Sequence, residues 1–508
     1  MPVPADDREI PLYVDLDGSL LRTDSLWESF ASALRRRPLA AIAALAALAS
    51  GRAAFKRRMA RLGAPEVASL PRHEAFLAWL RGQRAAGRRV VLATAADRAL
   101  AQSVAETVDA APSQPPSPPA SLPTPSSAGG LFDAVLASDG RHNLKGRHKL
   151  EAIRRDADGA PFDYCGNGPE DLPIFASARR AIVVGAPGRV LREARRRAEV
   201  AAVFDPPPAP AQRLRAWLGA LRPHQWLKNL LVLVPLLTSF RLDEPLALWE
   251  ALLGCAAFSL AASSGYLLND LLDLAADRRH PRKRERAFAA GRLPVRSGFA
   301  ASALLLVAAL AIAAAVGERF ALWVLAYLAM TGLYSGFAKR VALLDVATLA
   351  GLYTVRVLAG GAAIGVEVSF WLLAFSVFLF FSLALVKRCG ELVARFERDE
   401  DTAAGRGYGV EDLPVLQSLG IATSCAALLV LALYVQEPAV VQRYASPQIL
   451  WLMLVGLLIW LGRLWLATAR GTMHDDPLVF ALRDRGSRWV VGALLVLFGA
   501  AALSPWPG

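Results

Sequence analysis

Residues 269–283 read NDLLDLAADRRHPRK, and this acidic stretch joins two long apolar segments of a 508-residue chain. On a helix, Asn269, Asp273 and Asp277 are spaced at i, i+4 and i+8, so their oxygen atoms line one face within reach of a common cation. Mg²⁺ prefers oxygen ligands and commonly bridges to a diphosphate, and carboxylates at the end of an apolar segment are costly without a function. We therefore predict an Mg²⁺ site here, with Asp270 as a further ligand. A solvated acidic helix end is the simpler alternative.

Long apolar stretches with basic interruptions follow one another from about residue 228 onward. With 55% hydrophobic and only 20% charged residues, the chain is too apolar for an ordinary soluble enzyme of its length. Most of the stretches approach the roughly 20 residues that cross a hydrocarbon core. The sequence predicts an all-α polytopic membrane domain with about nine transmembrane helices. These are expected at 228–240, 246–268, 298–316, 319–337, 342–364, 369–387, 415–435, 447–467 and 488–503.

The connections between these stretches alternate in charge. Four of them, 269–297, 338–341, 387–414 and 463–488, together hold 20 Lys and Arg residues, whereas the opposite connections hold three. The positive-inside rule places the rich connections, and with them the N-terminal domain, in the cytoplasm and the C-terminus outside. This topology also accounts for the net charge of +13, and without a basic arm or an aromatic-interleaved patch we expect no nucleic-acid partner.

The first 205 residues have a different pattern, in which short apolar runs alternate with polar segments. The sequence DPPPAP at 205–210 predicts a stiff, extended linker. We expect an α/β domain over 1–205, a linker over 206–214 and the membrane domain over 215–508. A Pro/Ser-rich insertion at 112–130 is expected to be a disordered surface loop, because its composition cannot pack as helix or sheet.

Polar motifs follow the predicted strands of the N-terminal domain. The strand IPLYV (10–14) leads into DLDGS, in which Asp15 and Asp17 point the same way and Gly18 lets a phosphate approach the backbone. A second strand, VVLAT, ends at Thr94, the loop NLKG supplies Lys145, and the strand FDYC opens into GNGPED at 166–171.

This order of motifs resembles the haloacid dehalogenase (HAD) superfamily over roughly residues 10–200. The resemblance implies a three-layer α/β sandwich with a parallel sheet, Asp15 as the nucleophile and Asp17 as the general acid/base. It further implies that Thr94 and Lys145 hold the phosphoryl group, and that Asp15, Asp17 and Asp171 bind Mg²⁺. Asn167 stands where the family usually has an aspartate, which weakens the metal site. The alternative is a pseudo-phosphatase that only supports the membrane domain.

The N-D-x-x-D-x-x-x-D pattern resembles the UbiA superfamily of intramembrane prenyltransferases over roughly residues 215–508, and nine helices agree with that fold. Further motifs resemble the branch that transfers phosphoribose to polyprenyl phosphate, the decaprenyl-phosphate phosphoribosyltransferases. They are LRPHQWLKN at 221–229, DRRHPRK at 277–283, YSGFAK at 334–339, RVLAGG at 356–361 and KRCGE at 387–391.

The resemblance implies roles for residues of the membrane domain. Asp273 and Asp277 are the expected catalytic residues, because Mg²⁺ on these carboxylates neutralises a departing diphosphate. The expected substrate contacts are cationic: Arg222, Lys228, Lys339, Arg356 and Lys387. A polyprenyl chain is expected in an apolar groove open to membrane lipid, and the sequence leaves a homo-oligomer open.

Three functions follow from these patterns. The first is a bifunctional enzyme that joins 5-phosphoribose from phosphoribosyl diphosphate to polyprenyl phosphate and then removes the 5-phosphate with the HAD domain. The second is an aromatic prenyltransferase that uses a polyprenyl diphosphate. Such enzymes carry a second acidic motif, for which ERDED at 397–401 is the nearest equivalent. The third is a transporter or membrane scaffold without catalysis, which the clustering of polar residues at helix ends disfavours.

Overall fold

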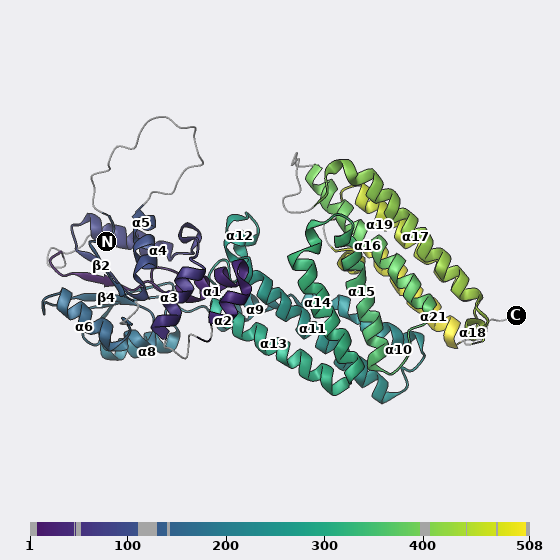
Figure 1. The fold of residues 1–508 in the computed structure, drawn as a ribbon, viewed down its shortest axis with the longest axis horizontal. Coiled ribbons are helices and arrows are strands. Elements are labelled where there is room, and N and C mark those ends of the chain that lie inside the picture. The colour runs from purple at the N-terminus through teal and green to yellow at the C-terminus, as the bar shows by residue number, and fades with distance from the viewer. Residues whose placement is uncertain are drawn as a thin grey trace. The chain divides into compact units, whose positions relative to one another are not determined.

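The computed structural model describes residues 8–44, 46, 52–109, 130–139, 143–396, 407–442, 444–473 and 476–503 (Figure 1). Residues 112–129 of the Pro/Ser-rich insertion and the acidic motif at 397–401 lie outside these ranges. The chain packs as two compact units. The first comprises 1–221 together with 266–302, and the second comprises 222–265 together with 303–508.

The first unit is built on a six-stranded parallel sheet, which confirms the predicted parallel α/β fold. The strands are β1 (Leu12–Val14), β2 (Val90–Asp97), β3 (Ala134–Ser138), β4 (Asp163–Gly166), β5 (Ala181–Val184) and β6 (Val200–Phe204). Their order in the sheet is β3-β2-β1-β4-β5-β6. In such a doubly wound sheet, ligands bind at the carboxyl ends of the strands where the order reverses, which here is the crevice beside β1 and β4.

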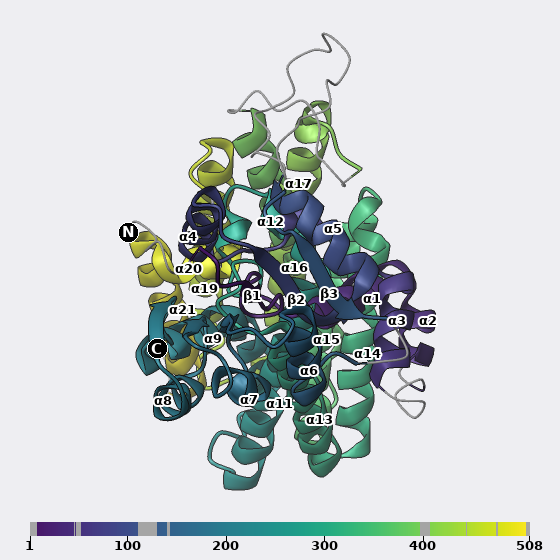
Figure 2. The same ribbon diagram turned by 90° about the vertical axis from the view of Figure 1, so that its left-hand side faces the viewer.

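Helices cover both faces of this sheet (Figures 1 and 2). One face packs against α4 (Glu74–Ala85) and α5 (Arg98–Asp109), and its core includes Phe76, Leu80 and Val104. The other face packs against α6 (Arg147–Asp156), α7 (Leu172–Phe175) and α8 (Gly188–Arg197), with Phe175 and Val190 buried there. Alternate strand side chains enter the two cores, because successive residues of a strand point to opposite faces.

Between β1 and α4 the described part of the chain forms three α-helices and a 3₁₀ turn: α1 (Ser25–Arg36), α2 (Pro38–Ala44), α3 (Arg52–Leu62) and η3 (Val67–Ser69). The Asp24 side chain caps α1 by accepting hydrogen bonds from the Leu26 and Trp27 amides. After β4 the 3₁₀ turn η4 (Pro169–Asp171) precedes α7, and after β6 comes α9 (Pro210–Leu221), so helix begins inside the predicted linker.

The acidic stretch belongs to the first unit, although it joins two apolar helices. It contains the end of α11 (Pro245–Leu272), α12 (Leu274–Arg279) and the start of η6 (Lys283–Glu285), and α13 (Val295–Val316) follows it in the chain. The predicted continuous helix is interrupted, because α11 ends at Leu272 and Asp273 adopts a non-helical conformation as the N-cap of α12.

The described residues contain eight helices that are long and apolar enough to cross a membrane, and each matches a predicted segment. Besides α11 and α13 they are α14 (Glu318–Gly336), α15 (Leu344–Ala363), α16 (Phe370–Phe396), α17 (Leu413–Gln436), α19 (Ile449–Ala469) and α21 (Arg485–Leu503). Shorter elements connect them: η7 (Ala338–Arg340), η8 (Val410–Asp412), α18 (Pro438–Val441) and α20 (Pro477–Arg483).

The ninth predicted helix, 228–240, is not an α-helix of spanning length. The 3₁₀ helix η5 (Pro223–Leu233) occupies most of it, followed by α10 (Val234–Thr238). Pro223 and Pro235 lack the amide hydrogens that a continuous α-helix requires. With about 2.0 Å per 3₁₀ residue and 1.5 Å per α residue, η5 and α10 together are still about 30 Å long.

This segment packs lengthwise along α15 in the same chain direction. The Lys228 ammonium lies 5.8 Å from the centre of the Tyr353 ring, and Arg356 donates to Asn229. Gly360 lies so close to Val232 that an added Cβ would be 2.1 Å from the Val232 carbonyl oxygen. The close approach at Gly360 therefore requires a residue without a side chain.

Candidate active sites

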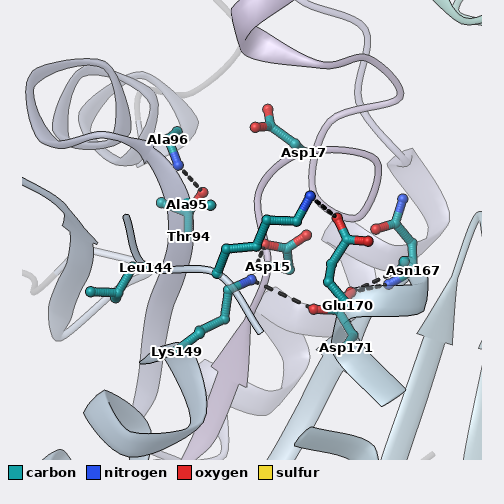
Figure 3. Close-up of polar contacts among 12 residues, drawn as sticks. Asp15, Asp17, Thr94, Ala95, Ala96, Leu144, Lys149, Asn167, Glu170 and Asp171 are labelled. Carbon is teal, nitrogen blue, oxygen red and sulfur yellow. Dashed lines mark hydrogen bonds and ion pairs between the residues drawn. The ribbon is translucent and has the colours of Figure 1, made fainter. Parts of the chain in front are cut away.

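Asp15 and Asp17 lie in the tight loop after β1, at the carboxyl edge of the sheet (Figure 3). The Asp15 amide donates to the Cys165 carbonyl of β4 at 2.9 Å, which holds the loop against the neighbouring strand. Gly18 has a φ of +80°, and a Cβ there would lie 1.8 Å from Asn167 Nδ2. Both the positive φ and the lack of space for a Cβ therefore require glycine at position 18.

Lys149 is the cation that contacts the predicted nucleophile. Its Nζ lies 2.7 Å from Asp15 Oδ1 and 3.6 Å from Asp171 Oδ1, and its side chain is only 3% exposed (Figure 3). The predicted phosphate contact, Lys145, instead pairs with Glu170 at 3.1 Å and is 42% exposed. Sequence reasoning missed Lys149, which lies in the first turn of α6 just after the loop that carries Lys145.

Asp171 closes the loop after β4. Its Oδ2 accepts hydrogen bonds from the amides of Asn167 at 3.0 Å and Gly168 at 2.9 Å, and its Oδ1 accepts from the Tyr164 hydroxyl at 2.7 Å. Asp15 and Asp171 therefore face the same ammonium from two neighbouring strands. The Asp17 carboxylate is engaged differently, because it accepts from the amide of Ser25 at 2.8 Å and from its hydroxyl at 3.0 Å.

Strand β2 continues past the predicted end at Thr94 to Asp97, and Thr94 is fully buried, with its Oγ1 accepting a hydrogen bond from the Ala96 amide at 3.0 Å. Sequence reasoning also missed Lys56 of α3, whose Nζ donates to the Ala95 carbonyl at 2.9 Å. Burial lowers the pKa of Lys56, while the carboxylates of Asp17 and Asp24 oppose this effect. The site thus combines carboxylates from the loop after β1 and from η4 with ammonium groups from α3 and α6.

Burial changes the acidity of the two loop carboxyls. It raises the pKa of Asp15, and the Lys149 ammonium opposes that rise. Burial and the neighbouring Asp24 carboxylate raise the pKa of Asp17 to about 7. A carboxyl that retains its proton near neutral pH is suited to act as a general acid.

In the acidic stretch, backbone hydrogen bonds preserve the spacing of one helical turn across the interruption at Asp273. The Asp273 amide donates to the Asn269 carbonyl at 3.0 Å, and the Asp277 amide donates to the Asp273 carbonyl at 2.8 Å. The carboxylates nevertheless pair differently from the prediction of one shared face. Asp270 Oδ1 and Asp277 Oδ2 lie 3.1 and 2.8 Å from the same atom, Arg286 Nη1, whereas Asp273 pairs with Arg35 at 2.9 Å.

The convergence of Asp270 and Asp277 on one cationic nitrogen fits a small cation, and oxygen ligands are those that Mg²⁺ prefers. Within the described part of the chain, no group of three or more His, Cys, Asp and Glu side chains is arranged to hold a metal ion. Asp270 and Asp277 would hold Mg²⁺ together with water and substrate oxygens, since this ion usually keeps several such ligands. By the same reasoning, Asp15 and Asp171, which both face Lys149 Nζ, fit a second Mg²⁺.

The second unit contains a cluster of charged side chains around Asp476, a residue that sequence reasoning missed. Asp476 Oδ2 lies 2.6 Å from Lys228 Nζ and 3.6 Å from Lys387 Nζ, and it accepts from the Tyr353 hydroxyl at 3.2 Å. The Asp476 side chain is only 7% exposed. Two of the predicted substrate contacts, Lys228 and Lys387, therefore meet at one buried carboxylate.

Arg356, a third predicted substrate contact, lies close to this cluster. Its Nε donates to Asn229 Oδ1 at 2.9 Å, and its guanidinium carbon lies 4.7 Å from the centre of the Tyr327 ring. Asn229 in turn donates to Ser259 at 3.0 Å. Arg356 is buried, so these neutral and aromatic partners hold its charge inside the helical bundle.

A mostly apolar cavity of about 660 Å³ adjoins these residues. Leu227 and Leu230, which flank Lys228 and Asn229 in the chain, line it together with Ser259. The other lining residues are Pro223, His224, Trp226, Cys255, Ala256, Leu260, Val479 and Arg483. The cavity is thus connected to Arg356 through Ser259 and Asn229.

The two remaining predicted substrate contacts are Arg222 and Lys339. Arg222 precedes η5 with a φ of +54°, an uncommon conformation for a residue with a side chain. Lys339 is half-buried in η7. A separate buried network contains Arg388, which binds Asp345 and lies 2.7 Å from Glu391.

Residues 232–488, about half of the chain, match the UbiA prenyltransferase family. The chain belongs to the UbiA prenyltransferase family. This UbiA-family chain is 38% identical to the uncharacterized protein y4nM of Sinorhizobium fredii over 490 residues, which cover 96% of this chain and 90% of that protein. It is 36% identical to the nodulation protein NoeC of Azorhizobium caulinodans over 270 residues, which cover 53% of this chain and 87% of that protein.

Further similarities of the UbiA-family chain cover less of its length. Decaprenyl-phosphate phosphoribosyltransferase of Mycobacterium tuberculosis is 36% identical over 153 residues, which cover 29% of this chain and 51% of that protein. A structure of a UbiA homolog from Archaeoglobus fulgidus bound to DMAPP and Mg²⁺ covers 57% of this chain and 99% of that chain, with 20% identity and a TM-score of 0.43.

Family membership confirms the resemblance that the acidic motif predicted for the membrane domain. Together with the eight apolar helices, it makes the UbiA-family chain a multi-pass membrane protein and an enzyme of the prenyltransferase class.

Proposed function

We propose that the membrane domain transfers 5-phosphoribose from phosphoribosyl diphosphate to a polyprenyl phosphate. The observation that carries this proposal is the cationic cluster of Lys228, Lys387 and Arg356 beside the apolar cavity. Asp476 pairs with Lys228 and Lys387, and Arg356 donates to the neutral Asn229, so the cluster retains positive charge for an anionic head group. The similarity to decaprenyl-phosphate phosphoribosyltransferase over 153 residues supports a phosphorylated lipid as the acceptor.

In this reaction a phosphate oxygen of the lipid forms a bond to C1 of the ribose, while the bond between C1 and the diphosphate oxygen breaks and diphosphate leaves. Lys228 and Lys387 neutralise the attacking phosphate and hold it in position. The polyprenyl chain extends into the cavity lined by Leu227 and Leu230. Arg356 adds positive charge at the buried end of the cluster.

The acidic stretch is the proposed site for the donor. Asp270 and Asp277 would hold Mg²⁺, with Asp273 and Asn269 next to them in the chain, and bound Mg²⁺ supplies the charge that stabilises a departing diphosphate. Arg286, which now neutralises Asp270 and Asp277, is available as a further contact for the diphosphate oxygens.

We further propose that the N-terminal domain is a phosphatase that removes the 5-phosphate from the lipid product. Asp15 attacks phosphorus, the bond from phosphorus to the sugar oxygen breaks, and Asp17 gives its proton to that oxygen. Water then hydrolyses the aspartyl-phosphate and releases inorganic phosphate. We assign the phosphate contacts to Lys149 and Thr94, and Lys149 replaces the predicted Lys145 because it is the lysine that meets Asp15. Asp15 and Asp171 would hold Mg²⁺.

The test incubates the full-length protein with Mg²⁺, a polyprenyl phosphate and radiolabelled phosphoribosyl diphosphate, and follows the label into the organic phase. We expect a labelled lipid in the wild type and none with Asp277→Asn, since this change removes a charge from the proposed metal site. If the wild-type protein instead consumes polyprenyl diphosphate with an aromatic acceptor and gives no labelled lipid, the proposed donor is wrong.

A further inference from the structure

Helix α1 of the N-terminal domain makes a buried ion pair with the acidic stretch. Glu28 Oε1 and Oε2 lie 2.6 and 3.1 Å from two nitrogen atoms of the Arg278 guanidinium. The two side chains are only 3% and 7% exposed. The Thr23 hydroxyl donates to the same carboxylate at 2.6 Å, so Glu28 is held from its own domain as well.

Arg278 connects this pair to the proposed donor site. It directly follows Asp277, and its Nε donates to the Ala289 carbonyl at 3.1 Å, which ties down the segment that returns from the acidic stretch. Arg286, which contacts both Asp270 and Asp277, lies in that returning segment. The Glu28 carboxylate therefore fixes Arg278, the neighbour of the proposed metal ligand Asp277. Through Arg278 it also fixes the segment that carries Arg286.

A second, independent contact joins the same elements. Gly291 has a φ of +68°, and a Cβ there would lie 2.8 Å from the Arg22 Cβ and 3.2 Å from the Arg22 carbonyl oxygen. At the start of α13, the Phe299 ring packs against Trp27 and Phe30 of α1, with ring centres 5.8 and 5.1 Å apart. The segment that follows the acidic stretch is thus packed against α1 and against Arg22, just before that helix.

We propose that α1 positions the acidic stretch for transfer, with Glu28 as the positioning residue. None of the contacts of Glu28 involves Asp15, Asp17 or Lys149, so this role is separate from the phosphatase chemistry. The proposal rests on the proposed function of the acidic stretch as a Mg²⁺ and diphosphate site. It makes the folded N-terminal domain a requirement of the membrane reaction, even when the phosphatase is inactive.

The test compares Glu28→Gln with Glu66→Gln in the full-length protein. Glu66 pairs with the neighbouring Arg279 at 3.6 Å, but this pair is exposed, with side chains 41% and 65% accessible, so it is a matched control. The first measurement is the rate of trypsin cleavage within 278–292, which does not depend on activity. We expect cleavage to be about 10-fold faster in Glu28→Gln, equivalent to 1.4 kcal/mol, and unchanged in Glu66→Gln.

The second measurement is the Mg²⁺ concentration that gives half-maximal lipid labelling. We expect it to rise several-fold in Glu28→Gln, with phosphate release from a soluble phosphate monoester unchanged. Gly291→Ala disturbs a different contact, the packing of the returning segment against Arg22, and should reproduce both effects, which guards against misfolding of one variant. Wild-type cleavage and Mg²⁺ dependence in both variants would overturn the proposal. Faster cleavage in a protein that never labels lipid would support the positioning by α1 and refute only the proposed function.

Discussion

Lys145 and Lys149 are four residues apart, yet their environments give them different chemistry. Lys149 is buried between Asp15 and Asp171, where a phosphoryl group bound to Asp15 would meet its ammonium. Lys145 points to Glu170 at a half-exposed position, where solvent screens its charge. The two lysines therefore provide a matched pair of substitutions at the phosphatase site.

We predict that Lys149→Gln lowers phosphate release from the 5-phosphorylated lipid by about 100-fold, the usual cost of removing one stabilising donor. Lys145→Gln should stay within about 10-fold of the wild type. Losing Lys149 also leaves Asp15 buried without its cation, which destabilises a protein by about 3–5 kcal/mol, so thermal unfolding is measured in parallel. Equal losses of phosphate release in the two variants would contradict the assignment.

Asp476 joins Lys228 and Lys387, and its position suggests a second residue-scale test. We predict that Asp476→Asn lowers lipid labelling by about 10-fold or more, because the two ammonium groups lose the charge that holds them together in a buried site. Asp484→Asn is the control, since Asp484 pairs with the half-exposed Arg463 at 3.2 Å. Labelling that falls equally in both variants would show a general effect on the helical bundle.

At this scale the sequence pointed to the residue types of the candidate site but not always to the residue that the structure brings there. Strand ends and the D-x-D-G motif pointed to Asp15 and Asp17, because the carboxyl ends of parallel strands meet at one edge. The choice between Lys145 and Lys149 depends on where α6 begins and which way its first turn faces. Asp476 escaped notice because it is 248 residues away in the chain from Lys228, the nearer of the two lysines that it meets.

At the scale of elements, apolar length predicted eight spanning helices well, since composition dominates that signal. The ninth segment is apolar enough but contains prolines, so its backbone forms η5 and α10 instead of one α-helix. The interruption of the acidic helix at Asp273 is also a backbone property. Spacing alone predicted one carboxylate face, and the structure instead pairs Asp270 with Asp277 through Arg286.

The packing of η5 and α10 along α15 supports a ninth crossing, because the segment is about as long as the hydrocarbon core is thick, roughly 30 Å. We therefore predict that the N-terminal domain and the acidic stretch face the cytoplasm while the connection between α10 and α11 faces outward. In a cysteine-free background, an impermeant thiol reagent should label Asp243→Cys in intact cells. It should label Arg284→Cys only after lysis. Both residues are exposed, so the reverse pattern would contradict this topology.

At the scale of the whole molecule, the two proposed reactions share an intermediate. The transferase product carries a 5-phosphate on its ribose, and a phosphate monoester is the substrate of the chemistry proposed for Asp15 and Asp17. Under the proposed positioning of the acidic stretch by α1, the N-terminal domain must remain folded for transfer. A variant that abolishes phosphate release without unfolding this domain therefore separates the two steps.

Asp15→Asn is such a variant, since Lys149 keeps its contacts with Asp171 and Tyr164. We predict that it labels polyprenyl phosphate at the wild-type rate but accumulates the 5-phosphorylated lipid, whereas the wild type converts it to a less polar species. Thin-layer chromatography of the labelled lipids separates the two products.

Asp158→Asn, at an exposed position with a φ of +50° that asparagine adopts readily, is the control and should behave as the wild type. If Asp15→Asn still forms the less polar lipid, the N-terminal domain acts on another phosphate ester. If it loses labelling and phosphate release together while remaining folded, the two reactions are not separable in this chain.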